Sequence, residues 1–224
     1  MSKTREKKGR HSIGFFIDWT ENPYHHSLLQ GVVEKAKERD VNLFVYVGGC
    51  INSPRAWEKP RNVIYNFVSK RRIDGLVISS GSVGHYSDLG DMESFVRNYE
   101  RFPCVSISQK IPGVPSILVD NSAGLREEIL HLFRDHGYRK IAFITGPGGN
   151  QESDQRFAVY RETLGEAGIP FNPDMVAEGD FVLQSGSKAM EQLIERNERI
   201  DAVIASNDDM ALGAMEFLSK QGIK

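Results

Sequence analysis

Short apolar runs alternate along the chain with longer stretches in which apolar residues recur every three or four positions. The runs predict buried strands and the periodic stretches predict amphipathic helices. In the first half, strands are expected at 13–17, 41–48, 74–81 and 104–109, and helices at 23–40, 57–72 and 91–102. Strands and helices that alternate at this spacing predict βαβ crossovers, and hence a parallel sheet with helices on both faces.

The segment 111–121, "IPGVPSILVDN", interrupts this rhythm. It holds two prolines, a glycine and a short strand, and no helix separates it from the strand at 104–109. We interpret it as a crossover between two lobes, because the alternation restarts after it. The second half has predicted strands at 140–146, 175–181 and 201–208, and predicted helices at 122–137, 153–168, 185–198 and 209–222.

The pattern therefore predicts an α/β protein made of two doubly wound parallel-sheet lobes. A basic flexible leader is expected at 1–12, an N-terminal lobe at 13–120 and a C-terminal lobe at 121–224. Ligands of open α/β sheets bind at the carboxyl ends of the strands. We therefore expect a ligand cleft between the two lobes, lined by the residues that follow the strands.

Composition narrows the classes of function. Charged residues make up 26% of the chain and the net charge is -2, so no electrostatic binding of nucleic acid is expected. A basic leader of this length cannot form a helix-turn-helix. No segment reaches the ~18 apolar residues of a membrane span, and no secretory signal precedes the first strand. Two isolated cysteines fit a reducing compartment, so we expect a cytoplasmic protein without membrane contact.

The stretch "AVIASNDDMALG" poses the main question about chemistry. Its apolar half predicts a buried strand, and that strand ends in Asn207, Asp208 and Asp209 where a helix starts. These residues either cap the helix or face a ligand, and the local sequence leaves both interpretations open. Tyr24, which follows the first strand, is likewise either a core residue or a ligand contact.

Catalytic and metal-binding motifs are weak. The segment 185–188, "SGSK", matches S-x-x-K, but a serine at a helix N-cap explains it more simply. The segment 146–149, "GPGG", lacks the lysine of a phosphate-binding loop and is interpreted as a turn. His25 and His26 point about 100° apart on a helix and cannot chelate one ion. We therefore predict no catalytic residue, no metal site and no cofactor.

Six segments, in order, resemble the ligand-binding core of the LacI/GalR repressors and of their periplasmic sugar-binding relatives. They are "ENPYHHSLLQG", "RRIDGLVISS", "VDNSAGLREEILHLFRDHGYRKIAFITGP", "QRFAVYRETLGEAGI", "EGDF" followed by "SG", and "AVIASNDDMALGAMEFLSKQGIK". The resemblance covers nearly the whole chain from Ile13. It implies the periplasmic-binding-protein-like fold of type I, with two lobes and a ligand cleft.

The resemblance also implies which residues bind the ligand. In the family, the positions of Arg156 and Asn207 contact ligand, and Asp208 is then expected to cap the last helix or to support Asn207. The ligand is expected to be a small polar effector, such as a sugar or a nucleobase. The predicted ligand-binding residues are Tyr24, His25, Ser80, Glu152, Arg156, Phe181, Asn207 and Asp208.

The chain departs from the family at both ends. Repressors carry a helix-turn-helix before this core, and the family core continues beyond the position of Lys224. We therefore expect a fragment that is truncated at its C-terminus, and a C-terminal lobe that is incomplete.

The leading hypothesis is a cytoplasmic, homodimeric small-molecule sensor domain. It is not expected to be an enzyme or to contact nucleic acid itself. It would regulate an attached output module in transcription or signal transduction, and a catalytic signalling module could follow beyond residue 224. The alternatives are a LacI-family repressor core without its helix-turn-helix, a doubly wound α/β enzyme, and a scaffold with an empty cleft.

Overall fold

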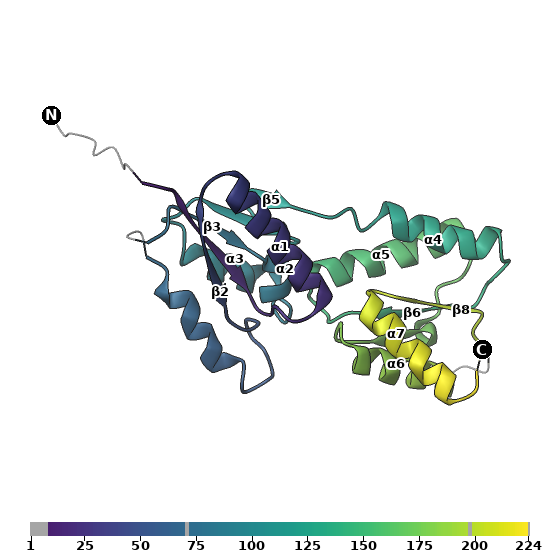
Figure 1. Cartoon of the computed structure of the whole chain (residues 1–224). Helices are drawn as coiled ribbons and strands as arrows, with labels where there is room; N and C mark the ends of the chain where they lie inside the picture. The colour runs from purple at the N-terminus through teal and green to yellow at the C-terminus, as the bar shows by residue number, and fades with distance from the viewer. Residues whose placement is uncertain (1–8, 70–71, 197–198, 224) are drawn as a thin grey trace. The chain divides into compact units, whose positions relative to one another are not determined.

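The computed structural model describes residues 9–69, 72–196 and 199–223 (Figure 1). These residues form two compact α/β units, the first ending at Leu118 and the second beginning at Val119. Most of the predicted basic leader, residues 1–8, lies outside the described residues. Its last part is already engaged with the first unit, because Arg10 forms an ion pair with Asp40 and the first strand begins at Ser12.

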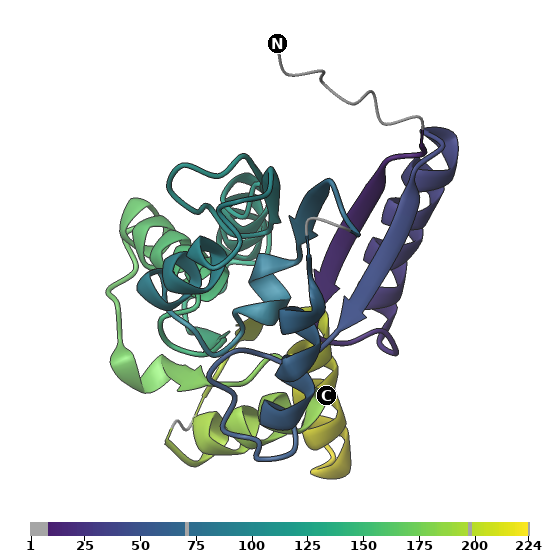
Figure 2. The ribbon, with the colours of Figure 1, turned by 90° about the vertical axis from the view of Figure 1, so that its left-hand side faces the viewer.

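The first unit is built on a parallel sheet of five strands in the order β2-β1-β3-β4-β5. Figure 2 shows β1 and β2 side by side. The strands are β1 (Ser12–Ile17), β2 (Asn42–Val47), β3 (Gly75–Ile78), β4 (Cys104–Ile107) and β5 (Ser116–Ile117). The helices are α1 (Pro23–Glu38), the 3-10 helix η1 (Lys59–Phe67), α2 (Ser80–Val83) and α3 (Leu89–Arg97).

Strand β1, which lies between β2 and β3, is buried on both faces. Phe15, Phe16 and Ile17 are consecutive in β1, so they point to alternate faces, and all three are fully buried. On one face, the Phe16 ring lies 4.7 Å from the Tyr65 ring and 5.0 Å from the Tyr99 ring. This burial explains why the sequence shows an uninterrupted apolar run instead of an alternating one.

The helix predicted at 57–72 differs in kind from the element that the structure shows there. The chain forms the 3-10 helix η1 there, and Tyr65 and Val68 are buried while Val63 and Phe67 are exposed. A 3-10 helix has about three residues per turn, so positions i and i+3 share a face. Asn62, one such turn before Tyr65, binds backbone groups of Gly49 and Cys50 and so extends this stripe.

The second unit is built on a parallel sheet of three strands in the order β7-β6-β8. The strands are β6 (Ile141–Thr145), β7 (Val176–Glu178) and β8 (Ala202–Ala205). The helices are α4 (Ala123–Arg134), α5 (Gln151–Glu166), the 3-10 helix η2 (Pro173–Met175), α6 (Leu183–Arg196) and α7 (Asp208–Lys220).

Strand β6 divides the core of this unit into two layers. Ile141 and Phe143 pack into a cluster with side chains of α4 and α5, whereas Ala142 and Ile144 pack into a cluster with side chains of α6 and α7. Figure 1 shows the same arrangement, with α4 and α5 on one side of the β6–β8 sheet and α6 and α7 on the other. The doubly wound α/β fold predicted from the sequence is therefore confirmed.

Both sheets contain the feature that positions ligands in this fold class. Strand order reverses between β1 and β3 in the first unit, and between β6 and β8 in the second. Such a switch point leaves a crevice outside the carboxyl ends of the two strands. The residues that follow these strands are therefore the first candidates for a site. Within the described residues, no helix is both long enough and apolar enough to cross a bilayer.

Candidate functional site

A cavity of about 360 Å³ opens at the switch point of the second unit, beyond the carboxyl end of β8. Its volume lies in the usual range of small-molecule sites. Three predicted ligand-binding residues line it, namely Arg156, Asn207 and Asp208. The full lining is Asp120, Asn121, Leu125, Glu128, Arg156, Ala205, Ser206, Asn207 and Asp208.

Arg156 is the central donor of this cavity. Its Nε and Nη2 donate to Asn121 Oδ1 over 3.1 and 2.8 Å, and its Nη1 donates to the Ser206 carbonyl over 2.5 Å. Glu152 lies one helical turn earlier on α5, with Oε2 3.9 Å from Arg156 Nη2. A guanidinium carries five N–H groups. The three bonds to described residues therefore leave two N–H groups that can donate to a ligand.

Asn207 answers the question raised by the sequence. Its Oδ1 accepts a hydrogen bond from the Met210 backbone N–H at 3.0 Å, so Asn207 is the N-cap of α7. Its Nδ2 donates to the Phe181 carbonyl at 2.9 Å. The expectation that Asp208 caps this helix is wrong, because Asp208 is the first helical residue and is exposed. Ligand contact by Asn207 stays a prediction, and the half-buried position of the residue in the cavity lining is compatible with it.

Sequence reasoning missed six of the nine residues that line this cavity, and two of them, Asn121 and Ser206, matter most for its chemistry. Asn121 holds Arg156 in place, and its only signal was its position in the segment "VDN". Ser206 is buried, and its Oγ has no hydrogen-bond partner within the described part of the chain. A buried hydroxyl without a partner costs about 1–3 kcal/mol, so Ser206 Oγ is a natural place for a ligand or a water to bind.

Glu128 and Phe181 set the surroundings of the cavity. Partial burial of the Glu128 carboxyl raises its pKa above the ordinary value. The Phe181 ring packs against the backbone at Gly146 and against the cluster under α6 and α7, so it is partly buried. Phe181 therefore reaches the predicted site through its carbonyl, and stacking of its ring on a ligand stays a prediction.

In the first unit, the residues after β1 form a buried polar cluster. His25 Nε2 lies 3.1 Å from Asp18 Oδ1, and His25 Nδ1 lies 2.5 Å from Oδ1 of Asn22, which caps α1. Burial by itself would raise the pKa of Asp18. The hydrogen bond and the charge of His25, with a smaller contribution from Ser82, outweigh burial and hold the pKa of Asp18 below its ordinary value.

Tyr24 and its neighbours occupy the same edge of the first sheet. The Tyr24 side chain is 54% exposed, so the alternative of ordinary core packing is wrong. Its hydroxyl lies 3.2 Å from Ser108 Oγ, just after β4. Gln109, the next residue, is buried with Oε1 unpartnered within the described residues. An exposed ring beside unpaired polar atoms is compatible with the predicted ligand contact.

Ser80 lies in a different environment from the other predicted contacts. It is the first residue of α2 and is fully buried. Its hydroxyl donates to the Ile78 carbonyl at 3.4 Å and accepts from Ser106 Oγ at 2.8 Å. A ligand contact by Ser80 would have to replace these bonds.

Two groups that could act as nucleophiles, Cys50 and Ser185, are held in structural roles. Burial, and the nearby carboxylates of Asp18 and Glu58, raise the pKa of the Cys50 thiol, and a protonated thiol is a weak nucleophile. Ser185 Oγ accepts from the Asp180 N–H at 2.8 Å and donates to the Val182 carbonyl at 2.7 Å. Ser185 lies inside α6 and is not its N-cap as expected. No group of three or more His, Cys, Asp or Glu residues in the described chain could hold a metal ion.

Two parallel doubly wound units, each with polar residues at its switch point, define a ligand-binding domain of the periplasmic-binding-protein class. The chain belongs to the family of periplasmic binding proteins and sugar binding domains of the LacI family, whose model matches residues 10–224. The resemblance inferred from the sequence motifs is therefore confirmed.

Known relatives agree with this assignment. The chain is 28% identical over 228 residues to the probable HTH-type transcriptional repressor ExuR of Bacillus subtilis (strain 168), covering 100% of the chain and 63% of ExuR. The structure of transcription regulator CcpA of Lactococcus lactis is similar with a TM-score of 0.78 and 26% identity, over 96% of this chain and 75% of CcpA. The structure of a transcriptional regulator CelR–cellobiose complex is similar with a TM-score of 0.75 and 26% identity, over 96% of this chain and 65% of CelR.

The chain spans about three fifths of the length of these curated relatives. It covers 63% of ExuR and 61% of the catabolite control protein A of Priestia megaterium. ExuR, CcpA of Lactococcus lactis and CelR are named as regulators of transcription.

Proposed function

We propose that this chain is the effector-binding domain of a LacI-type transcriptional regulator and binds a small polyhydroxylated ligand at the cavity around Arg156. The observation that carries the proposal is the convergence of Arg156, Ser206 and Asn207 on one cavity at a topological switch point. The names of the relatives support the regulatory part.

The polar groups of the cavity favour a sugar over a nucleobase. Arg156 offers N–H donors, Glu128 and Asp208 offer carboxylate acceptors, and Ser206 offers a hydroxyl that can do either. Sugar hydroxyls both donate and accept, so a polyol can satisfy donors and acceptors that alternate around a small cavity. The bound cellobiose of the related CelR complex supports the same ligand class.

Regulation follows from differential affinity. A ligand that binds one conformation of the chain more tightly than another shifts the population toward the first. An attached DNA-binding module then responds to that shift, and the coupling free energy sets the size of the response. Homodimerisation, a cytoplasmic location and ligand contacts by Tyr24, His25 and Ser80 belong to this proposal as well.

Arg156 provides the decisive test. The experiment is a calorimetric titration of sugars, sugar acids and nucleosides into the wild-type chain and into Arg156→Met. Loss of hydrogen bonds from a charged group is worth about 1.5–3 kcal/mol, so a sugar that binds the wild type is expected to bind the variant roughly 10- to 150-fold more weakly. Arg134→Met is the matched control, since Arg134 is an exposed residue of α4 outside the cavity.

The test also separates this proposal from its alternatives. A scaffold with an empty site predicts no saturable ligand and full tolerance of substitution at Arg156 and Asn207. An α/β enzyme predicts turnover of a bound compound, and turnover that is lost in Ser185→Ala without unfolding would favour it. Equal affinity of a sugar for the wild type and Arg156→Met would refute the site assignment.

A further inference from the structure

A second cavity lies at the other end of the β7-β6-β8 sheet. Its volume is about 350 Å³, and it opens where β6 and β8 begin instead of where they end. We call it the basal cavity, and its main lining residues are Lys140, Tyr160, Leu164, Asn172, Met175 and Arg199. Since β6 has 5 residues, at ~3.3 Å per residue roughly 16 Å of sheet separates the basal cavity from the Arg156 cavity.

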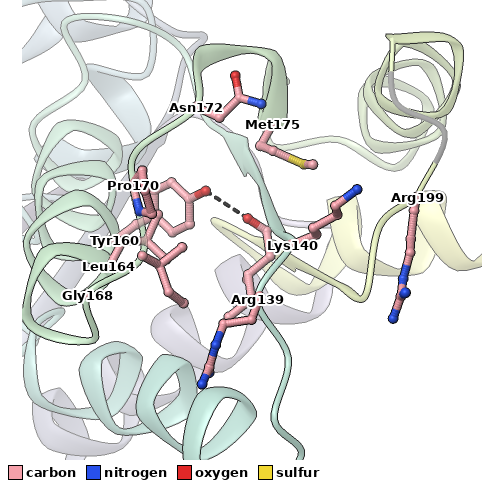
Figure 3. Close-up of a pocket in the computed structure, with 11 residues that line it drawn as sticks. Arg139, Lys140, Tyr160, Leu164, Gly168, Pro170, Asn172, Met175 and Arg199 are labelled. Atoms are coloured by element: carbon pink, nitrogen blue, oxygen red, sulfur yellow. Dashed lines mark hydrogen bonds between the residues drawn. The ribbon is translucent and has the colours of Figure 1, made fainter.

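One side of the basal cavity is formed by buried, mainly apolar side chains. Figure 3 shows Tyr160 and Leu164 of α5 on this side, together with Gly168 and Pro170 of the following loop. Tyr160, Leu164 and Met175 are buried. The Tyr160 hydroxyl already donates to the Ile141 carbonyl at 2.8 Å, so it adds hydrocarbon and not a free polar group to the wall.

The rim of the basal cavity is cationic. Lys140 and Arg199 lie on the side opposite Tyr160 in Figure 3, whereas the Arg139 side chain points away from both. None of the lining residues is acidic. The Asp201 carboxylate binds residues of this rim: its Oδ1 accepts from Arg199 Nε at 2.9 Å, and its Oδ2 accepts the backbone N–H groups of Arg139 and Lys140 at 3.0 Å each.

The three cationic side chains differ in the partners that they already contact. Arg199 is paired with Asp201, and the Arg139 guanidinium stacks 4.0 Å from the centre of the Phe133 ring. Lys140 is exposed and forms no ion pair within the described part of the chain. Lys140 therefore offers, beside an apolar wall, a cation that no ion pair within the described part of the chain occupies.

We propose that the basal cavity is a second effector site, for a small organic anion. The hydrocarbon body of the ligand packs between Tyr160, Leu164 and Met175, and its carboxylate or phosphate is bound at the rim by Lys140 and the amide N–H₂ of Asn172. The Asn172 Oδ1 already accepts from the Asp174 N–H at 3.0 Å, so we assign the Nδ2 donors of this amide to the ligand. A single anionic group on an apolar body distinguishes this ligand from the polyol proposed for the Arg156 cavity.

The test compares three probes of one shape and different charge by calorimetry or NMR titration. They are 3-phenylpropionate, 3-phenylpropanol and 3-phenylpropylamine, and 3-phenylpropyl phosphate separates a phosphate from a carboxylate preference. The propionate is expected to bind saturably and about threefold to tenfold more tightly than the alcohol, since exposed ion pairs contribute modestly. The preference is expected to shrink as salt is raised, because rim charges are screened.

Charge variants at the rim give the sharpest outcomes. Lys140→Met is expected to reduce the preference for the anion, and Lys140→Glu is expected to reverse it toward the amine. Lys188→Met is the matched control, since Lys188 is an exposed residue of α6 outside the cavity. Both Lys140 variants change an exposed side chain, so the fold is expected to persist.

Three results would overturn the proposal. They are equal binding of anion and alcohol, an unchanged preference in Lys140→Glu, and loss of anion binding in Arg156→Met. The last result would place the anion in the Arg156 cavity. Failure of the sugar titrations leaves this test unaffected, because the probes and the substituted residues differ.

Discussion

Asn207 joins two backbone segments with one side-chain amide, and its removal provides a quantitative test of the site. Its Oδ1 caps α7 through the Met210 N–H, and its Nδ2 binds the Phe181 carbonyl. Loss of an N-cap costs about 0.5–2 kcal/mol, and loss of a neutral hydrogen bond costs about 0.5–1.5 kcal/mol. We therefore expect Asn207→Ala to lower the free energy of unfolding by roughly 2 kcal/mol.

Asn207→Asp separates the two contributions. The carboxylate keeps the cap acceptor and gains about 0.3–1 kcal/mol at the positive end of the helix. It loses the donor to Phe181 and places a second oxygen beside that carbonyl, which lies 2.9 Å from the Nδ2 it replaces. The expected loss is about 1 kcal/mol, which is smaller than for Asn207→Ala.

The assay is urea unfolding followed by far-UV circular dichroism. Tryptophan fluorescence is less suitable, because Trp19 and Trp57 both lie in the first unit whereas Asn207 lies in the second. Asn98→Ala is the control, since Asn98 is an exposed residue at the C-cap of α3 and is expected to stay within about 0.5 kcal/mol of wild type. A loss below 0.5 kcal/mol in Asn207→Ala, or an equal loss in Asn207→Asp, would refute the reasoning.

Further predictions concern packing, pH and thiol reactivity. Gly213→Ala in α7 would place Cβ onto a backbone carbonyl oxygen of α6, so urea unfolding should show a loss of about 3 kcal/mol or more. Gly165→Ala in α5, where a Cβ meets nothing, should instead gain about 0.5–1 kcal/mol. The depressed pKa of Asp18 stabilises the fold above about pH 4 and this stabilisation is lost as the pH falls through the folded-state pKa. Asp18→Asn should therefore flatten the decline of the urea midpoint below pH ~4, and an unchanged decline would contradict this. Cys50 should resist a disulfide reagent in the native chain and react on unfolding, because the thiol is buried with a raised pKa.

The fold could be predicted from the sequence because the most deeply buried strands appear as uninterrupted apolar runs. The run 13–17 is apolar throughout, and β1 is covered on both faces. The 3-10 character of η1 could not be predicted, because Val63 and Phe67 fit a helical stripe equally well. The fold instead buries the face that carries Asn62, Tyr65 and Val68. Asn62 binds backbone groups of the loop at Gly49 and Cys50, and the local sequence does not reveal that contact.

The position of the site could be predicted from the sequence, but the hydrogen bonds within it could not. Arg156 and Asn207 follow strands whose carboxyl ends meet at one edge, so their proximity follows from the topology. Asn121 lies 35 positions before Arg156, and only the tertiary fold shows that it accepts two of its hydrogen bonds. The choice between Asn207 and Asp208 as cap was also beyond the sequence, since both residue types cap helices well. The extended backbone of Asn207, with φ -155° and ψ 169°, decides it.

Strand β8 connects the two cavities proposed as ligand sites. Asp201 precedes this four-residue strand and binds Arg199 at the rim of the basal cavity, whereas Ser206 follows it and accepts from Arg156. An anion bound at Lys140 lies beside the residue whose backbone N–H Asp201 binds, and a polyol at Arg156 shares that guanidinium with the Ser206 carbonyl. The two ligands therefore lie at opposite ends of the same strand. If they are coupled, the coupling is reciprocal, so each must change the affinity of the other by the same factor.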